Sequence, residues 1–343
     1  MTTTQQSPAP PTTAPTTPMS RRVLGLLGNQ QVMLLIVWLA MIVLFTSLNK
    51  IFFSVGVAGN VLADWGPVVL IALGETFVVI TGGIDLSVGA TVTLSGVLAA
   101  YAMKDMTANG SGQTITLLVG VLVCVIVGGV VGLINAFLIN KARLVPFIAT
   151  LATLGAAGGM AIVLTGGAPI GEGPPSAITL SVPWLGPFST PILIVFVIVV
   201  ILWLFLHKAR FGRYTYAIGS NSFAARAAGI NVQRHITKVY VLSGALAGLA
   251  GMFFYLRLGS GAPTSGKGME LNAIAAVVIG GAALSGGVGR ITGTVLGAFV
   301  LTTVTSGLII IGVNPNWNQV VVAVLIAVAA AVQSLRPQDG RSS

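Results

Sequence analysis

Ten stretches of the chain consist almost entirely of apolar residues, and short polar segments separate them. They lie near residues 31–48, 66–81, 87–103, 114–139, 146–165, 191–207, 238–256, 270–285, 291–312 and 317–333. A helix needs about 20 residues to cross a bilayer, with roughly 17 to 25 normal. The pattern therefore predicts an all-α polytopic membrane protein with about ten transmembrane helices. The runs 66–81 and 270–285 are short, as expected of broken helices near a transport pathway.

The composition agrees with a surface that faces lipid. Apolar residues make up 55% of the chain and charged residues only 7%, whereas a soluble domain carries about 25% charged residues. The net charge of +10 comes from basic residues in the short gaps between apolar runs. Basic residues in such gaps usually set membrane orientation, so no nucleic-acid partner is expected.

Polar tails flank the apolar region. Residues 1–22 are rich in Thr and Pro and are predicted to form a disordered tail, because they lack the apolar content needed for a core. Residues 23–335 form the predicted transmembrane domain, and residues 336–343 form a second polar tail.

The basic residues predict an orientation. If all ten runs cross, one side receives few basic residues, namely Lys50, Lys104, Arg257 and Lys267. The other side receives many more, namely Arg21, Arg22, Lys141, Arg143, Lys208, Arg210, Arg213, Arg226, Arg234, Lys238, Arg290, Arg336 and Arg341. Because cytoplasmic loops carry an excess of Lys and Arg, both termini are predicted to be cytoplasmic.

The longest predicted cytoplasmic segment, residues 208–237, contains a short helix-like stretch from Asn221 to Ala228. Asn221 or Ser222 can cap its start, and Gly229 can end it in the left-handed conformation. Its alanines offer a compact surface for another protein: Ala224, Ala225, Ala227 and Ala228. A basic loop that only fixes orientation is the alternative. A loop that only fixes orientation would not need a capped, alanine-rich helix. The presence of such a helix therefore favours a protein-docking element.

Two glycine-rich segments interrupt the apolar runs. The first, residues 81–89, begins with Thr81 and contains Gly82 and Gly83 in succession. Adjacent glycines disfavour a continuous helix. Asp85 or Ser87 can then cap the helix that follows.

Glu75 lies just before this break, inside an apolar run. An acid in a membrane helix usually faces the bundle interior or a cavity, so it is a candidate functional residue. The alternative is an internally bonded Glu75 that only holds helices together.

The second break, residues 280–290, also separates two apolar runs. Unwound backbone at membrane depth must be buried in protein or line water, where it can contact a polyhydroxylated solute. A tight cytoplasmic turn is an equally good interpretation.

The chain offers little for catalysis or for binding a nucleotide or a metal. No nucleophile–base pair, paired carboxylates or metal cluster is evident in the sequence, so neither an enzyme nor a metal site is expected. Residues 261–268 nearly match a phosphate-binding loop, but Gly268 replaces the required Ser or Thr, and the segment follows a membrane helix.

Four segments resemble a known family. The run GETFVVITGGIDLSVGA, from Gly74 to Ala90, resembles the signature of permeases from sugar importers of the ribose, xylose, arabinose and galactose type. Three more segments are similar and occur in the same order: PFIATLATL at 146–154, AIGSNSFAARAAGI at 217–230 and MELNAIAAVVIGGAALSGGVGRITGTVLGA at 269–298. The family often has Asp where this chain has Asn272. This difference leaves the identity of the transported sugar open and does not affect the class of transporter.

The resemblance implies a type II importer fold of an ATP-binding cassette (ABC) transporter, in the inner membrane of a prokaryote. It implies a second permease copy, an extracytoplasmic sugar-binding protein, and a cytoplasmic ATPase that binds ATP and Mg²⁺, with no cofactor on this chain. The ATPase-coupling residues carried over are Gly219, Ser220, Asn221, Ala224, Ala225, Ala228, Gly229 and Ile230. The substrate-pathway residues are Glu75, Thr81, Gly82, Gly83, Asp85, Ser87, Phe147 and Asn272.

The expected function is therefore ATP-driven import of a pentose, hexose or related polyol. An ABC permease for amino acids or nucleosides is the alternative within the same fold. An ion-coupled transporter has less support, because only Glu75 and Asp85 qualify as coupling acids. A channel or scaffold would not account for the predicted docking helix.

Overall fold

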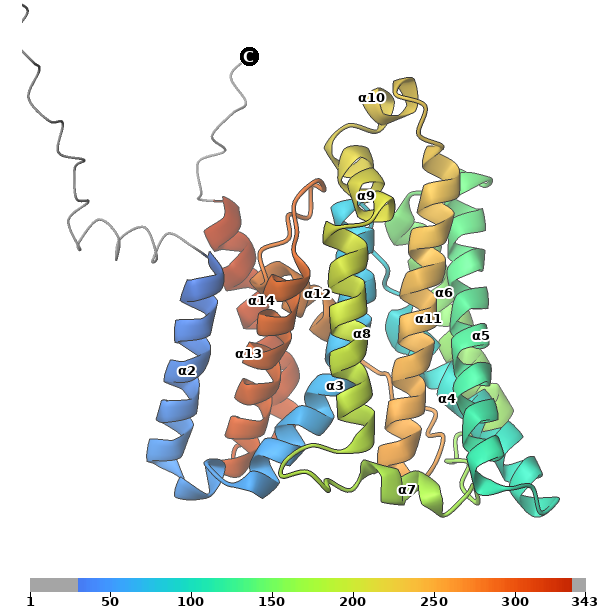
Figure 1. Ribbon diagram of the computed structural model, residues 1–343, viewed down its shortest axis with the longest axis vertical. Helices are drawn as coiled ribbons and strands as arrows, with labels where there is room; N and C mark the ends of the chain where they lie inside the picture. The colour runs from blue at the N-terminus through green and yellow to red at the C-terminus, as the bar shows by residue number, and fades with distance from the viewer. Residues whose placement is uncertain (1–29, 335–343) are drawn as a thin grey trace, which may run out of the picture.

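The computed structural model describes residues 30–334 and is shown in Figure 1. The predicted tails at 1–22 and 336–343 lie outside these residues, as do the basic residues Arg21, Arg22, Arg336 and Arg341. The described residues are 77% helical, and they contain no β-strand apart from two isolated bridges. The predicted all-α fold is confirmed.

Each of the ten apolar runs contributes to a helix of the bundle. In chain order the elements are α2 (Gln30–Leu48), η1 (Lys50–Phe52), α3 (Val55–Ile80), α4 (Val88–Ala108), α5 (Gln113–Asn140), α6 (Pro146–Thr165), α7 (Ser176–Ser181), α8 (Thr190–His207), α9 (Arg210–Ser220), α10 (Ser222–Ala227), α11 (Val232–Leu258), α12 (Met269–Ile279), α13 (Ile291–Ile310), η2 (Pro315–Trp317) and α14 (Asn318–Ser334). In the described region, 7 helices are long and apolar enough to cross a membrane, namely α2, α3, α5, α6, α8, α11 and α13.

Helix α3 forms the centre of the bundle. Every residue from Trp65 to Ile80 is buried, and α3 packs against α8, α11, α12 and α13. The run 66–81 was predicted to be short, and this prediction is wrong, because the helix begins at Val55 and has 26 residues. The first half of the helix contains glycine and polar residues such as Asn60 and Asp64. Because they interrupt the apolar pattern, the sequence did not indicate where the helix begins.

Helix α12 is short, as predicted for the run 270–285. It ends at Ile279 after 11 residues, which corresponds to about 16 Å, or half of a bilayer core. The chain reaches α12 through residues 259–268, which return from the end of α11 along α4. The backbone N–H of Gly266 donates to the Thr93 hydroxyl of α4 at 3.0 Å.

Two ends of the bundle are distinguished below. The α10 end carries α9 and α10, at the top of Figure 1, and the α7 end carries α7 at the bottom. Helix α2 begins toward the α10 end, and α14 ends toward it. The sequence pattern did not predict α9, α7 or η1, because each is too short to show its own apolar period.

Candidate functional site

The first glycine-rich break lies against a fully buried cluster of polar side chains. Asp85 is at the centre of this cluster, and its carboxylate accepts from the backbone N–H of Ser87 at 3.0 Å and from the Ser87 hydroxyl at 2.6 Å. Asn135 of α5 donates to the carboxylate at 3.3 Å, and Ser243 of α11 donates at 3.1 Å. One side chain therefore joins the break to two neighbouring helices.

The cluster continues into α6 through Asn135. The Asn135 amide donates to the Ser87 hydroxyl at 2.8 Å, and its carbonyl oxygen accepts from Thr153 at 2.5 Å. Thr150 of α6 and Tyr240 of α11 both donate to the backbone carbonyl of Ile84, at 3.3 Å and 3.4 Å. Hydrogen bonds thus hold the unwound segment from three sides, as non-helical backbone in a membrane requires.

Glu75 belongs to the same cluster. Its Oε1 accepts from the backbone N–H of Asp85 at 3.1 Å, while its Oε2 has no hydrogen-bond partner among the described atoms. Both acids are completely buried. Glu75 therefore ties the end of α3 to the break, and this geometry matches the internally bonded alternative. Whether Glu75, Asp85 or Ser87 also contacts substrate stays a prediction.

Sequence reasoning predicted that Asp85 or Ser87 would cap α4, and the structure differs. Ser87 occupies the N-cap position, but its side chain makes no capping bond. The Asp85 carboxylate instead binds Ser87 itself and the neighbouring helices. Thr81 is the C-cap of α3, and Gly82 adopts φ +81°, so the chain reverses at that glycine.

Helices α9 and α10 form an elbow at the α10 end. The Asn221 side chain caps α10 by accepting from the backbone N–H groups of Phe223 and Ala224, both at 3.0 Å. Gly229 has φ +83° and ends the turn, as predicted. Phe223 is 83% exposed, whereas Ala225 is only 4% exposed and packs with Ile218 and Val232. The alanines therefore do not form one docking face, because Ala225 packs inside the elbow.

The elbow contacts the end of α3, just before the first break, and also the second break. Gly219, near the end of α9, lies so close to the Ile80 carbonyl and to Gly287 that a side chain there would collide with backbone. The backbone N–H of Gly287 donates to the Ile80 carbonyl at 2.8 Å, and the Tyr216 hydroxyl donates to the Gly289 carbonyl at 2.7 Å. Burial raises the pKa of Tyr216, so its hydroxyl stays protonated and keeps donating.

The second break is a turn at the α10 end. Its backbone closes on itself, with the N–H of Ala283 donating to Val288 at 3.0 Å and that of Gly286 donating to Ala283 at 2.9 Å. Of the two interpretations considered for residues 280–290, the structure supports the tight turn. One contact region thus joins this turn, the end of α3 and helix α9. It comprises Ile80, Tyr216, Gly219, Gly287 and Gly289 and is called the coupling knot below.

The other predicted pathway residues lie apart from the buried cluster. Phe147 is 49% exposed in the first turn of α6, and Asn272 of α12 lines a hollow near the α7 end.

Sequence reasoning missed Asn135, Thr153, Tyr240 and Ser243. An amide inside the apolar run 114–139 was the available signal for Asn135. Among the described residues, no three His, Cys, Asp or Glu side chains gather to hold a metal.

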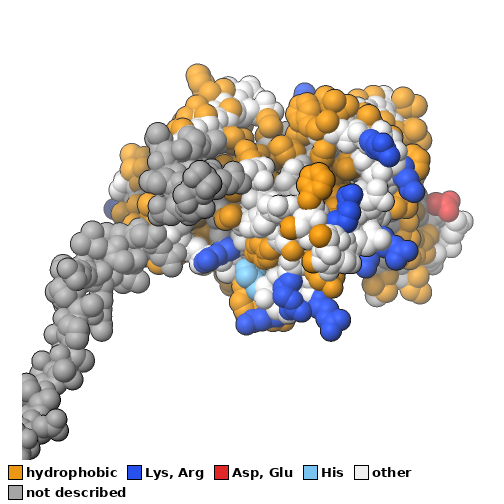
Figure 2. All heavy atoms as spheres, turned by 90° about the horizontal axis from the view of Figure 1, so that it is seen from above, with side chains coloured by type: hydrophobic (Ala, Val, Ile, Leu, Met, Phe, Trp, Pro, Cys, Tyr) orange, Lys and Arg blue, Asp and Glu red, His pale blue; other side chains and the backbone are white. Residues whose placement is uncertain are grey.

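Basic side chains gather at the α10 end. Figure 2 looks onto this face, where Lys and Arg side chains are spread around the elbow and acidic side chains show only at the edge. The basic residues there are Lys141, Arg143, Lys208, Arg210, Arg213, Arg226, Arg234, Lys238 and Arg290. The described basic residues toward the other end are fewer, namely Lys50, Lys104, Arg257 and Lys267.

Comparison with known proteins identifies the class. The family described as the branched-chain amino acid transport system / permease component matches residues 57–330. The chain belongs to this permease family. The permease is a multi-pass membrane protein and a transport component, not an enzyme. No solved structure matches it.

Several curated relatives of the permease are named for sugars. It is 38% identical to the ribose import permease of Escherichia coli strain K12, over 88% of this chain and 92% of that protein. It is 42% identical to the ribose import permease of Bacillus subtilis strain 168, over 76% and 79%. It is 36% identical to the D-allose transport system permease of Escherichia coli strain K12, over 78% and 80%. The predicted resemblance to sugar-importer permeases is confirmed.

Proposed function

We propose that this permease is the membrane-spanning subunit of an ABC importer that moves a monosaccharide into the cell. The named relatives support the sugar, since ribose, allose and galactose permeases match most of the chain. The family description names branched-chain amino acids, so an amino acid is the second candidate.

The coupling knot is the observation that carries the ATP-driven part of this proposal. A capped elbow with an exposed aromatic side chain is suited to docking another protein, because hot spots of protein interfaces are often aromatic. Movement of this elbow reaches the end of α3 and the turn before α13 through direct backbone contacts. ATP hydrolysis on a partner can thereby alter the packing of the bundle, while ATP and Mg²⁺ stay on that partner.

The charge distribution supports an orientation. Basic residues are concentrated at the α10 end, and cytoplasmic loops of membrane proteins carry such an excess. On this proposal the α10 end faces the cytoplasm of a prokaryote, with both termini on that side. The ATPase then docks on α10, and the sugar-binding protein docks on the α7 end.

The exposed face of α6 supports a second permease copy. Gly155 and Gly159 lie on this face with no atom near the position of a β-carbon, and Ala156 between them is also exposed. Small residues let membrane helices approach closely. We assign this face to contact with the second copy, which would place the sugar pathway between the two chains.

Uptake tests the proposed function directly. Cells that express the permease with its ATPase and binding protein are expected to take up one of ribose, allose or galactose, and to lose this uptake when the ATPase is catalytically dead. Uptake of leucine and of nucleosides is measured in parallel. Sugar uptake is also measured after an uncoupler has collapsed the ion gradient. Uptake of leucine alone would select the amino-acid permease. Uptake that survives the dead ATPase but collapses with the ion gradient would refute the ABC assignment.

Replacing Phe223 with aspartate is expected to weaken ATPase binding by about 2 kcal/mol or more, or roughly 30-fold in Kd. The side chain is 83% exposed, so the change leaves the packing of the elbow intact. Co-purification with the ATPase and a binding titration measure the effect. Phe53→Asp is the matched control, because Phe53 is 77% exposed near the α7 end. Equal ATPase affinity of the two variants would argue against docking at α10.

A further inference from the structure

A polar hollow of about 300 Å³ opens near the α7 end, between α3, α11, α12, α13 and α14. Six polar side chains from α3, α11, α12, α14 and the loop before α12 line it: Asp64, Arg257, Lys267, Asn272, Asn318 and Gln319. Its volume lies at the lower end of the roughly 300–1,000 Å³ range of small-ligand sites. Convergence of polar groups from four helices and the loop before α12 on one hollow is typical of a binding site.

Several of these groups have free hydrogen-bonding capacity. The side chains of Lys267, Asn318 and Gln319 form no hydrogen bond or ion pair with any described residue, and the Asn272 amide contacts only the Met269 sulfur at 3.7 Å. An amide offers both donors and an acceptor, and an ammonium offers three donors. A solute in the hollow would therefore meet hydrogen-bonding groups that no other described residue uses.

The remaining lining complements these donors. The hydroxyls of Thr302 and Thr305 donate to backbone carbonyls of their own helix, at 3.0 Å and 3.2 Å, so toward a ligand their oxygens act as acceptors. Apolar groups complete the wall: Pro67, Val68, Phe254, Met269, Leu301 and Val322. A sugar ring has hydroxyls at its rim and C–H groups on its faces, and this lining offers partners for both.

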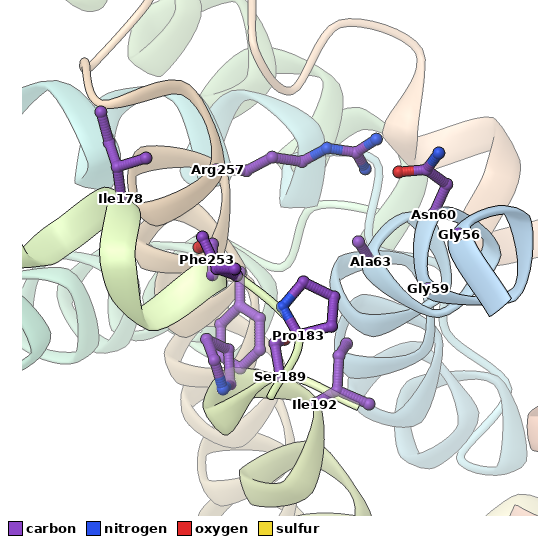
Figure 3. Close-up of a pocket in the computed structure, with 13 residues that line it drawn as sticks. Gly56, Gly59, Asn60, Ala63, Ile178, Pro183, Ser189, Ile192, Phe253 and Arg257 are labelled. Carbon is purple, nitrogen blue, oxygen red and sulfur yellow. The ribbon is translucent and has the colours of Figure 1, made fainter. Parts of the chain in front are cut away.

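Arg257 joins this hollow to a second one. Figure 3 shows the second hollow, about 440 Å³ in volume, with the Arg257 guanidinium and the Asn60 amide pointing toward one another at its mouth. Arg257 lines both hollows and forms an ion pair with Asp64, which lines the first. The pair therefore stands between the two spaces, and its charges largely cancel.

We propose that the first hollow is a binding subsite for a neutral monosaccharide on its way into the importer. This inference rests on the proposed function and deepens it by placing the sugar on named residues. Amides of Asn272, Asn318 and Gln319 bind the hydroxyls, and Lys267 adds donors at the rim. A zwitterionic amino acid fits less well, because the one carboxylate of the hollow is already paired with Arg257 and no free anion remains for an ammonium group.

Cysteine protection tests the subsite in the full permease with its ATPase in membrane vesicles. The native Cys124 is fully buried, so a membrane-impermeant thiol reagent reports only an introduced cysteine. We expect Gln319→Cys to react, and D-ribose, D-allose or D-galactose at about ten times its dissociation constant to slow the reaction about tenfold. Asn318→Cys is a second reporter if the first variant does not assemble. Asn109→Cys, exposed in the loop between α4 and α5, is the matched control and should react at an unchanged rate.

The outcomes separate the subsite from the proposed function. Equal reaction of Gln319→Cys with and without each sugar, in a complex whose wild type imports that sugar, would overturn the subsite alone. A reporter that does not react at all would contradict an open hollow. Protection by leucine and not by any sugar would replace the ligand class. Failure of the wild type to import any of the three sugars would overturn the proposed function and the subsite together.

Discussion

Replacing Asp85 with leucine is expected to abolish transport and to destabilise the folded permease by about 3 kcal/mol or more. The carboxylate accepts from Ser87, Asn135 and Ser243, and leucine accepts from none of them. The donors would remain buried, and no water is available in the membrane interior to replace the lost acceptor. The break would lose its attachment to α5 and α11 together.

The Asp85→Asn variant is the matched comparison. Its amide oxygen keeps an acceptor for Ser87 and Asn135 in a side chain of the same shape, so the loss of stability should be smaller than for leucine. Denaturant unfolding in detergent micelles and uptake in cells measure the two effects. Leucine and asparagine variants of equal stability would show that the hydrogen bonds of Asp85 contribute little.

The second large effect is expected where α5 crosses α11. A β-carbon at Gly128 would collide with the backbone of Gly244, and one at Gly132 would collide with the backbone of Tyr240. Gly128→Ala should therefore push the two helices apart and cost about 1–3 kcal/mol, as overpacking does elsewhere. Gly128, Gly132 and Gly244 thus let the backbones of α5 and α11 approach closely.

Gly129→Ala is the control for this change, since its nearest neighbour would be a Val241 methyl at 4.0 Å. Alanine favours a helix over glycine by up to about 1 kcal/mol, so this variant should be as stable as the wild type or more so. The fraction that remains monodisperse after heating in detergent compares the two variants. A Gly128→Ala protein as robust as the Gly129→Ala protein would contradict close backbone contact between α5 and α11.

Features that depend on local sequence were predictable. The apolar runs locate the helices of the bundle, because burial and lipid exposure both demand apolar side chains over the length of a crossing. Gly82 marks the first break, since only glycine adopts its φ of +81° at little cost. Asn221 and Gly229 mark the limits of α10 by their capping chemistry.

Features that depend on tertiary packing were not predictable. Asn135 and Ser243 lie 50 and 158 residues from Asp85, and only the packing of α5 and α11 brings them to it. Ala225 resembles its neighbours in sequence, yet Ile218 and Val232 cover it. The start of α3 at Val55 was hidden because this half of the helix carries Asn60 and Asp64 toward hollows at the α7 end.

The coupling knot has a mechanical consequence. Gly219 lies directly on the Ile80 carbonyl, with no side chain between them to deform, so a displacement of α9 is passed on almost undiminished. Because α3 runs through the centre of the bundle and packs against α8, α11, α12 and α13, a movement at the elbow would act on the packing of all four helices. Asn60 and Asp64 lie in the other half of α3, beyond Pro67, and a proline inside a helix removes one of its hydrogen bonds. The helix can therefore bend between the half that meets the elbow and the half that lines the hollows at the α7 end.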